Sequence, residues 1–263
     1  MHRFYLPPEQ CRGEVLVLEE REAHHALHVL RVQPGERVTV LDGAGRECLC
    51  EVQERARDQV QLAIIEKRFV PPLPYRITLL QGLPKGKLIE SIIQKATELG
   101  ATRIVPLLSA RVVAHLDLKE SQSRERKWQR VAIEAIKQSG SAWLPRVDSP
   151  LTPAQFLARG ETFELPLIGS LHADSKHPRE YFDAFQRDHR RPPASIGIWI
   201  GPEGDFTPEE LGSIQSAGAL PITLGRQVLR TETAAIYCLS IINYELQSLP
   251  AEDSIKGGTA PAL

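Results

Sequence analysis

The sequence is poor in cysteine and has no long apolar run. It contains four cysteines in 263 residues, and their spacing does not match that of a zinc site. Cys48 and Cys50 stand two residues apart in an expected strand, so they share one face and are predicted to be small core residues. No signal peptide is recognisable, and no apolar segment is long enough to span a bilayer. These features predict a reduced, cytoplasmic protein.

Net charge is also nearly absent. The formal charge is −1 at pH 7, so contacts with nucleic acid must come from local basic patches.

Two nucleotide-binding motifs are missing as well. No Gly-x-Gly-x-x-Gly follows a predicted strand, which argues against an NAD enzyme. The loop at residues 82–87 faintly resembles a phosphate loop but lacks the spacing and the Ser/Thr of a Walker motif, which argues against nucleotide hydrolysis.

The first 70 residues are mainly β-structure. Alternating apolar residues predict strands at residues 14–18, 36–41, 46–52 and 59–65, with a turn signal at Asp42-Gly43. Several short strands in so little sequence indicate a small barrel. The proline-rich residues 70–74 predict an extended linker and mark a domain boundary.

One helix, at residues 21–32, interrupts these strands. His24 and His28 are four residues apart and could share a metal ion on one helix face. We favour the alternative of a partly exposed helix that contacts RNA through His25 and Arg31, and we expect no metal site.

From Arg76 onward, predicted strands and helices alternate. Strands are expected at 77–80, 103–108, 165–171, 196–200 and 221–224, and helices at 88–99, 124–137, 178–186, after Thr207 and from Thr231. This alternation is typical of a parallel sheet that is covered by helices on both faces.

The stretch from residue 196 to residue 235 contains two strand-to-loop-to-helix transitions. Gly-Pro-Glu-Gly at 201–204 ends one strand, and Thr207 with Glu210 forms a capping box for the next helix. Gly225 breaks the chain a second time before the apolar helix that begins at Thr231. Open α/β sheets bind ligands where such transitions meet. Alone, the first loop could be only a turn, but Arg230, Glu232 and two threonines cluster at the start of the last helix.

The expected helix at 124–137 has one basic side, formed by Arg124, Arg126, Lys127 and Arg130. Such a face is usually solvated. The alternative is a face that binds RNA phosphates.

Several segments together resemble the 16S rRNA uracil-N3 methyltransferases of the SPOUT superfamily. The matching text is Lys-Ala-Thr-Glu-Leu-Gly at 95–100, Ile-Val-Pro at 104–106, Gln-Ser-Gly at 138–140, Ile-Gly-Pro-Glu-Gly at 200–204 and Val-Leu-Arg-Thr-Glu-Thr-Ala at 228–234. His25, Val-Leu-Arg at 29–31 and Gly35 also fit. The resemblance runs from about residue 2 to residue 247.

The resemblance implies a PUA-like RNA-binding β-barrel domain at residues 1–70. At residues 76–249 it implies a SPOUT-type α/β methyltransferase domain with a deep C-terminal trefoil knot. It further implies S-adenosyl-L-methionine as methyl donor, 16S rRNA of the small ribosomal subunit as substrate, and a homodimer. Residues 250–263 lack periodicity, and we expect a disordered tail there.

Three loops would hold the cofactor. The expected cofactor-binding residues are Leu171, His172, Gly201, Pro202, Glu203, Gly204, Leu224, Gly225, Val228 and Leu229. The expected RNA-binding residues are His25, Arg31, Arg111, Arg126, Arg130, Gln138 and Arg146.

Two residues are the catalytic candidates. Arg230 would stabilise negative charge on the uracil oxygens, and Glu232 would act as a base or simply favour the helix dipole. The chain departs from the family at Asp205, where a glycine is common, and at Ser141, where an arginine is common and whose contact Arg146 could replace. A ribose 2′-O-methyltransferase and a non-catalytic RNA-binding assembly factor are the alternative functions.

Overall fold

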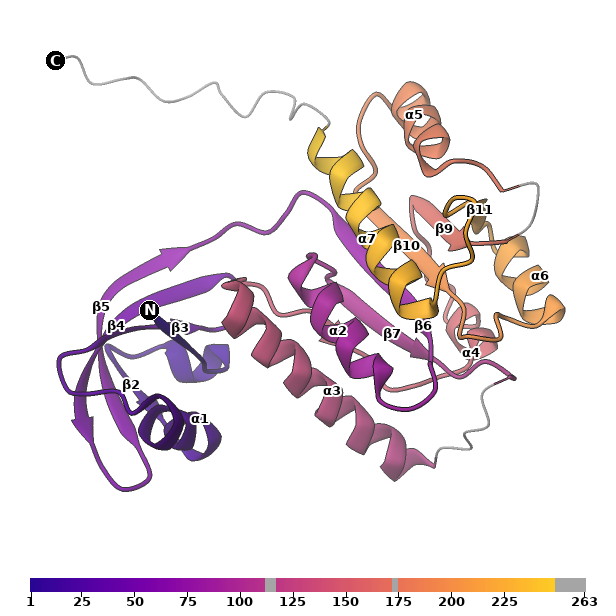
Figure 1. Cartoon of the computed structure of the whole chain (residues 1–263). Helices are drawn as coiled ribbons and strands as arrows, with labels where there is room; N and C mark the ends of the chain where they lie inside the picture. Colours follow the sequence, from indigo (N-terminus) through magenta and orange to yellow (C-terminus); the bar gives the residue numbers. More distant parts are fainter. Residues whose placement is uncertain (112–116, 172–174, 249–263) are drawn as a thin grey trace, which may run out of the picture.

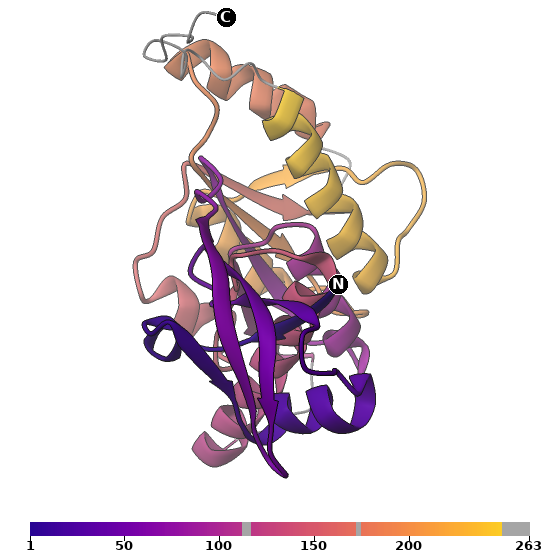
Figure 2. The same cartoon turned by 90° about the vertical axis from the view of Figure 1, so that its left-hand side faces the viewer.

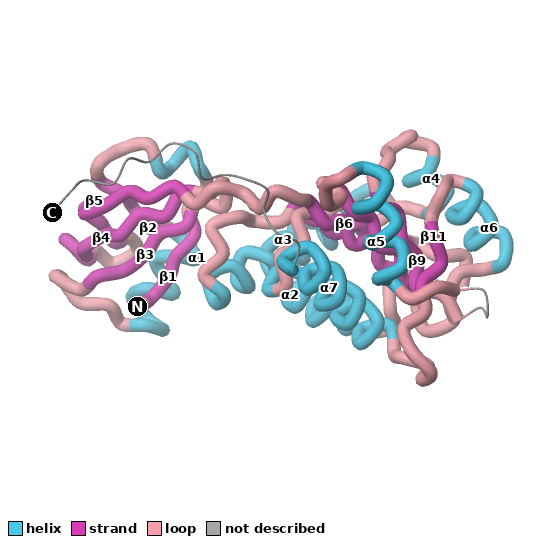
Figure 3. Tube along the Cα trace, turned by 90° about the horizontal axis from the view of Figure 1, so that it is seen from above, coloured by secondary structure: helices cyan, strands magenta, loops and turns pink. Residues whose placement is uncertain are grey.

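The computed structural model describes residues 1–111, 117–171 and 175–248. The predicted tail at 250–263 and the candidate His172 lie outside the described residues. Within them, two sheets occupy opposite ends of the molecule when it is seen from above (Figure 3).

The first sheet contains five strands in the order β1-β3-β4-β5-β2. Their bounds are β1 His2–Tyr5, β2 Val15–Leu18, β3 Arg37–Leu41, β4 Arg46–Arg55 and β5 Val60–Phe69. All pairings are antiparallel except that of β1 with β3. Cys48 and Cys50 are buried in its core, as predicted. The strand β1 was not predicted, because a four-residue edge strand has no clear period.

Helical segments complete the core of this sheet with Cys11, Ala23, Ala26 and Leu27, and Figure 2 shows the helix that follows β2 at the lower right, beside the strands. They are the short 3₁₀ helix Pro8–Cys11, α1 at Glu20–His24 and a π-helical turn at His25–Leu30. The single helix predicted at 21–32 is therefore an α-helix that widens into a π-helix at His25 and ends at Arg31 in the left-handed region, with φ of 55°.

The second sheet is entirely parallel, as the alternation of elements predicted. Its order is β11-β9-β10-β6-β7-β8. The strands are β6 Arg76–Gly82, β7 Arg103–Leu107, β8 Arg146–Val147, β9 Leu165–Gly169, β10 Ser195–Ile200 and β11 Leu220–Ile222. Only the two-residue β8 was not predicted, since it is too short to show a pattern.

Helices cover both faces of this sheet. The helices are α2 Leu88–Glu98, α3 Leu118–Ser139, α4 Pro153–Leu157, α5 Pro178–His189, α6 Pro208–Ser216 and α7 Thr231–Ser248. Figure 1 shows α2, α3 and α7 together on one face, where they share a core with Ile77 and Leu79 of β6. On the other face, α4 and α6 pack against Leu80 and Trp199. The helix α3 begins earlier than predicted, because Asp117 and Glu120 form a capping box.

The two sheets are joined by the turn between β3 and β4. Gly45 N donates to Ala142 O at 2.9 Å, and Leu144 N donates to Gly43 O at 2.9 Å, so this hairpin pairs with the segment after α3. A Cβ at Gly45 would lie 2.6 Å from the Trp143 ring. Glycine, which has no Cβ, avoids this clash. Beside this contact, the buried Lys137 ammonium of α3 lies 2.8 Å from Glu22 Oε1 of α1.

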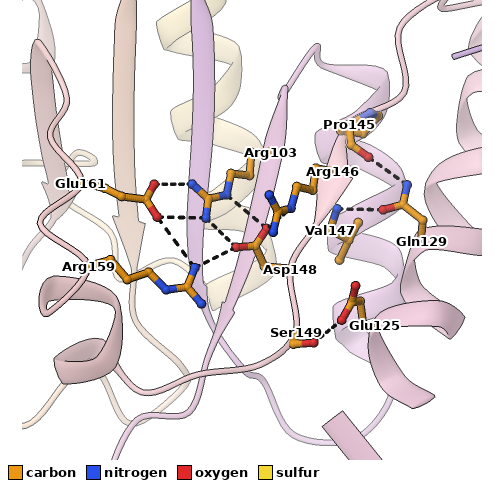
Figure 4. Close-up of polar contacts among 10 residues, drawn as sticks. All are labelled: Arg103, Glu125, Gln129, Pro145, Arg146, Val147, Asp148, Ser149, Arg159 and Glu161. Atoms are coloured by element: carbon orange, nitrogen blue, oxygen red, sulfur yellow. Dashed lines mark hydrogen bonds and ion pairs between the residues drawn. The ribbon is translucent and has the colours of Figure 1, made fainter. Parts of the chain in front are cut away.

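An ion cluster fastens β8 to β7 at the sheet edge (Figure 4). Asp148 is 2% exposed and lies 2.5 Å from Arg103 Nη2, with Arg146 and Arg159 also in contact. Arg103 pairs with Glu161 as well. The hydrogen bonds to Asp148 raise the pKa of Arg103, and the hydrogen bond from Arg103 lowers the pKa of Glu161.

We predict that Asp148→Asn destabilises the fold by about 3 kcal/mol, because it leaves the largely buried Arg103 guanidinium with one carboxylate instead of two. The free energy of unfolding in urea measures this cost. The control is Arg191→Gln, which breaks an exposed pair with Glu164 and is expected to leave the urea midpoint nearly unchanged. Equal effects of the two substitutions would contradict a structural role for the cluster.

Candidate functional site

The carboxyl ends of β9, β10 and β11 open into one cavity of about 470 Å³. The register of the parallel strands brings Trp199 beside Ile168 and Gly169 beside Ile222, so the loops that follow start at the same edge. The cavity is lined by Gly169, Ser170, Leu171, Ile200, Gly201, Pro202, Glu203, Asp205, Thr223, Leu224, Gly225, Arg226, Gln227, Val228, Leu229, Arg230, Thr231 and Ala234. Three loops that are far apart in the sequence thus form one site.

Most of the expected cofactor-binding residues line this cavity. Gly204 does not, since it faces a neighbouring cavity. Leu171 and Val228 are 67% and 76% exposed, which is unusual for large apolar side chains. Both line the same cavity, so a ligand with an apolar surface would cover them.

A buried hydrogen-bond network holds the loop at 201–204 against the rest of the site. Thr231 Oγ1 donates to Gly201 O at 2.6 Å and accepts from Gln81 Nε2 at 2.9 Å. Gln81, at the end of β6, is fully buried and also donates to Gly82 O. The network joins β6, the loop after β10 and the start of α7.

No sequence motif predicted a role for Gln81 or for the Thr231 hydroxyl. The signal in the sequence was a glutamine directly after the mainly apolar residues 77–80 of the expected strand. A buried amide needs a polar partner, but its partner is 150 positions away and cannot be read from the sequence.

Glycine is required at two points of close backbone approach. A Cβ at Gly82 would lie 2.5 Å from Pro202 Cδ, and a Cβ at Gly201 would lie 2.4 Å from Asp205 Oδ1. Asp205 has a φ of 61°, a region that glycine adopts at no steric cost. Its carboxylate accepts from Phe206 N at 2.8 Å, directly before α6.

The two catalytic candidates occupy different positions. The exposed Arg230 lines the cavity, directly before α7. Glu232 lies in the first turn of α7, is half-buried and is not among the lining residues. The geometry thus favours Arg230 as the group that meets a ligand, and the role of Glu232 as a base stays a prediction.

The expected RNA-binding residues fall in two places. Arg126 and Arg130 are exposed on α3, and exposed Arg111 donates to Gly204 O beside the cavity. Arg146 contacts Asp148 but remains 73% exposed. Their contact with RNA stays a prediction.

His25 and Gln138 lie where the first sheet meets α3. Burial, and next the Lys137 ammonium, lower the pKa of His25, whose Nδ1 is 3.4 Å from Lys137 Nζ. Gln138 is exposed, and its carbonyl accepts from Arg3 of β1. Arg31 is exposed at the end of the π-helical turn.

Across 1–111, 117–171 and 175–248, no three His, Cys, Asp or Glu side chains gather as metal ligands. The His24 and His28 rings are 4.9 Å apart. In that same part of the chain, no helix is long and apolar enough to cross a membrane.

Comparison with known proteins identifies the class. A family model described as an RNA methyltransferase domain matches residues 71–243, and an RNA methyltransferase PUA domain matches residues 18–65. The chain therefore has the domain content of an RNA methyltransferase.

Individual relatives narrow this class. The chain is 36% identical to ribosomal RNA small subunit methyltransferase E of Synechocystis over 94% of its own length and 78% of the relative. The Bacillus subtilis relative of the same name is 33% identical, over 87% and 89% of the two chains. The methyltransferase E structure from Neisseria gonorrhoeae, solved bound to S-adenosyl methionine, is 30% identical with a TM-score of 0.79 and covers 93% of this chain and 97% of that one. The chain belongs to the ribosomal RNA small subunit methyltransferase E family.

We predict that Gly82→Ala destabilises the protein by about 2 kcal/mol, because the new Cβ displaces Pro202 and the buried network behind it. Thermal unfolding measures the change. Gly212→Ala in α6 is the control, since its Cβ meets nothing within 4 Å and alanine favours a helix. A Gly82→Ala protein as stable as the control would show that the loop at 201–204 moves without cost.

Proposed function

We propose that the chain transfers a methyl group from S-adenosyl-L-methionine to N3 of a uridine in the 16S rRNA of the small ribosomal subunit. The observation that carries this proposal is the cavity at the carboxyl edge of the parallel sheet, lined by three loops and Arg230, in a chain of the methyltransferase E family. An rRNA substrate also places the reaction in the cytoplasm.

The residues present fit the cofactor. Gly201 and Gly225 let the backbone approach a bound adenosine, while Leu171, Leu224 and Val228 offer apolar walls. When bound, the sulfonium supplies an electrophilic methyl group, so the protein has mainly to align the target nitrogen with it.

The residues of this chain then act on the base. N3 of uracil carries a proton at neutral pH, and its loss leaves negative charge on the ring oxygens. Arg230, exposed in the cavity wall, would stabilise that charge. Glu232 is our less direct candidate for taking the proton, since its place in the first turn of α7 also suits the helix dipole alone.

The finer architecture is part of the proposal. We assign residues 1–70 to a PUA-like barrel domain that binds RNA and residues 76–249 to a SPOUT domain with a deep trefoil knot. The sheet order supports the knot, because β11 lies beyond β9 while α7 returns to pack on α2.

A homodimer is supported by Tyr237 and Tyr244, which are seven residues apart on α7 and are both exposed.

Methyl transfer from labelled S-adenosyl-L-methionine to small subunits that lack the modification tests the proposal, with nucleoside mass spectrometry of the product. We expect 3-methyluridine. A ribose-methylated product would assign the chain to the 2′-O-methyltransferases instead. Failure to bind the cofactor in calorimetry would favour a non-catalytic assembly factor.

We predict that Arg230→Ala lowers kcat by at least about 10²–10³-fold, the loss typical of one group that stabilises a developing anion. Circular dichroism should show the fold intact, because the Arg230 side chain is exposed. Arg187→Ala, an exposed arginine at the end of α5, serves as the control and should keep wild-type turnover. Near-wild-type turnover of Arg230→Ala would rule out its role.

A further inference from the structure

A second cavity, of about 660 Å³, lies directly beside the first. It is bounded by the loop at 82–87 before α2, by the first half of α3 and by the loop at 201–204. Pro202 and Glu203 line both cavities, so these two residues form the wall between them. No role in the proposed methyl transfer has been given to this space.

The second cavity is strongly basic in a chain whose net charge is only −1. Five of its lining residues are cationic, against two carboxylates, Glu90 and Glu203, so its formal charge is +3. The cationic residues are Lys85, Lys87, Arg111, Arg124 and Lys127. Charge of one sign concentrated in a concave site attracts an anion more strongly than the same charge on a flat surface.

The structure does not neutralise this charge internally. Glu90 is paired with Lys127, and Glu203 Oε1 accepts from Lys85 N at 3.0 Å. Within the described residues, the side chains of Lys85, Lys87 and Arg124 form no hydrogen bond or ion pair. Three cations that have no partner among the described residues therefore remain available to a ligand.

The local sequence explains this arrangement. Gly86 has a φ of 68°, which turns the chain so that Lys85 and Lys87 flank the start of α2. No side chain caps α2, so its first amide groups add partial positive charge at the same place. The loop at 82–87 thus gathers positive charge without the Walker motif that nucleotide hydrolysis requires.

The cavity suits a phosphate rather than a base. The aromatic side chain in its lining, Trp128, is only 3% exposed and belongs to the core beneath α2 and α3. It therefore offers no open ring for a base to stack on, and recognition rests on charge.

The position of the second cavity beside the first indicates which phosphate it would bind. Because Pro202 and Glu203 line both cavities, an RNA strand whose base enters the first cavity at Arg230 would bring a neighbouring phosphate to the second. Outside the cavity, Arg126 and Arg130 are further exposed arginines on α3.

We propose that the second cavity binds an internucleotide phosphate of the RNA strand next to the target uridine, through Lys85, Lys87 and Arg124, and so anchors the base opposite the methyl donor. This inference rests on the proposed function, since it takes the RNA as the occupant.

The test compares Lys87→Ala/Arg124→Ala with the wild type and with Lys119→Ala, an exposed lysine of α3 outside the cavity. Binding of a 16S rRNA fragment is measured across a salt series. We expect the double variant to bind on the order of tenfold more weakly and to lose about 1 to 2 from the slope of log affinity against log salt, the signature of lost phosphate contacts. The KM for subunits should rise, with kcat, cofactor affinity, melting temperature and oligomeric state unchanged.

An unchanged slope and KM in the double variant would overturn the proposal. A second arm titrates inorganic phosphate. Competition between phosphate and RNA supports the proposal, whereas phosphate that still binds at saturating RNA shows a separate free-anion site and overturns it.

The two proposals can fail separately. If the wild type methylates subunits but the slope is unchanged in the variant, only the phosphate site is wrong. If the slope falls but the wild type transfers no methyl group to N3, the phosphate site stands and the proposed reaction is wrong.

Discussion

The hydrogen bond from Thr231 to the carbonyl of Gly201 is the contact on which the site depends. It is buried, it is oriented by Gln81, and it ties the start of α7 to the loop after β10. On its other side the same loop is held by Lys85 N and by Arg111, which contact Glu203 and Gly204. A single short loop is therefore fixed from two directions, and it serves as the wall of both cavities.

Local pattern was enough to predict most of the fold. The capping box of Thr207 and Glu210, the apolar period of α2 and the alternation after Arg76 each reflect contacts within a few residues. The pairing of β1 with β3 and the capture of β8 by the ion cluster around Asp148 depend instead on residues that are distant in the chain. The spacing of apolar residues along the sequence does not reveal these long-range contacts.

The functional site was likewise predictable only in part. That the loops after β9, β10 and β11 would converge followed from the geometry of parallel sheets, and Gly201, Leu224 and Arg230 do line one cavity. Which side chains turn inward did not follow: Glu232 is adjacent in sequence yet outside the cavity. The basic side of α3 was recognised from the sequence, but its meeting with the loop at 82–87 and Arg111 in one cavity could not be predicted, because the three segments come together only when the chain folds.

The hydrogen bonds between the hairpin of β3 and β4 and the segment after α3 hold the first sheet at a fixed distance from the second cavity. The first half of α3 supplies Arg124 to the second cavity, and near its C-terminal end the carbonyl of Gln138 accepts from Arg3 of β1. The 14 residues between these two points set a span of about 21 Å along the helix. If the first sheet and the second cavity both bind RNA as proposed, an RNA must keep a fixed shape over that length to contact both, and a short oligonucleotide that carries the target base would contact only one of them. Substrate selection then follows from size and shape as well as from sequence.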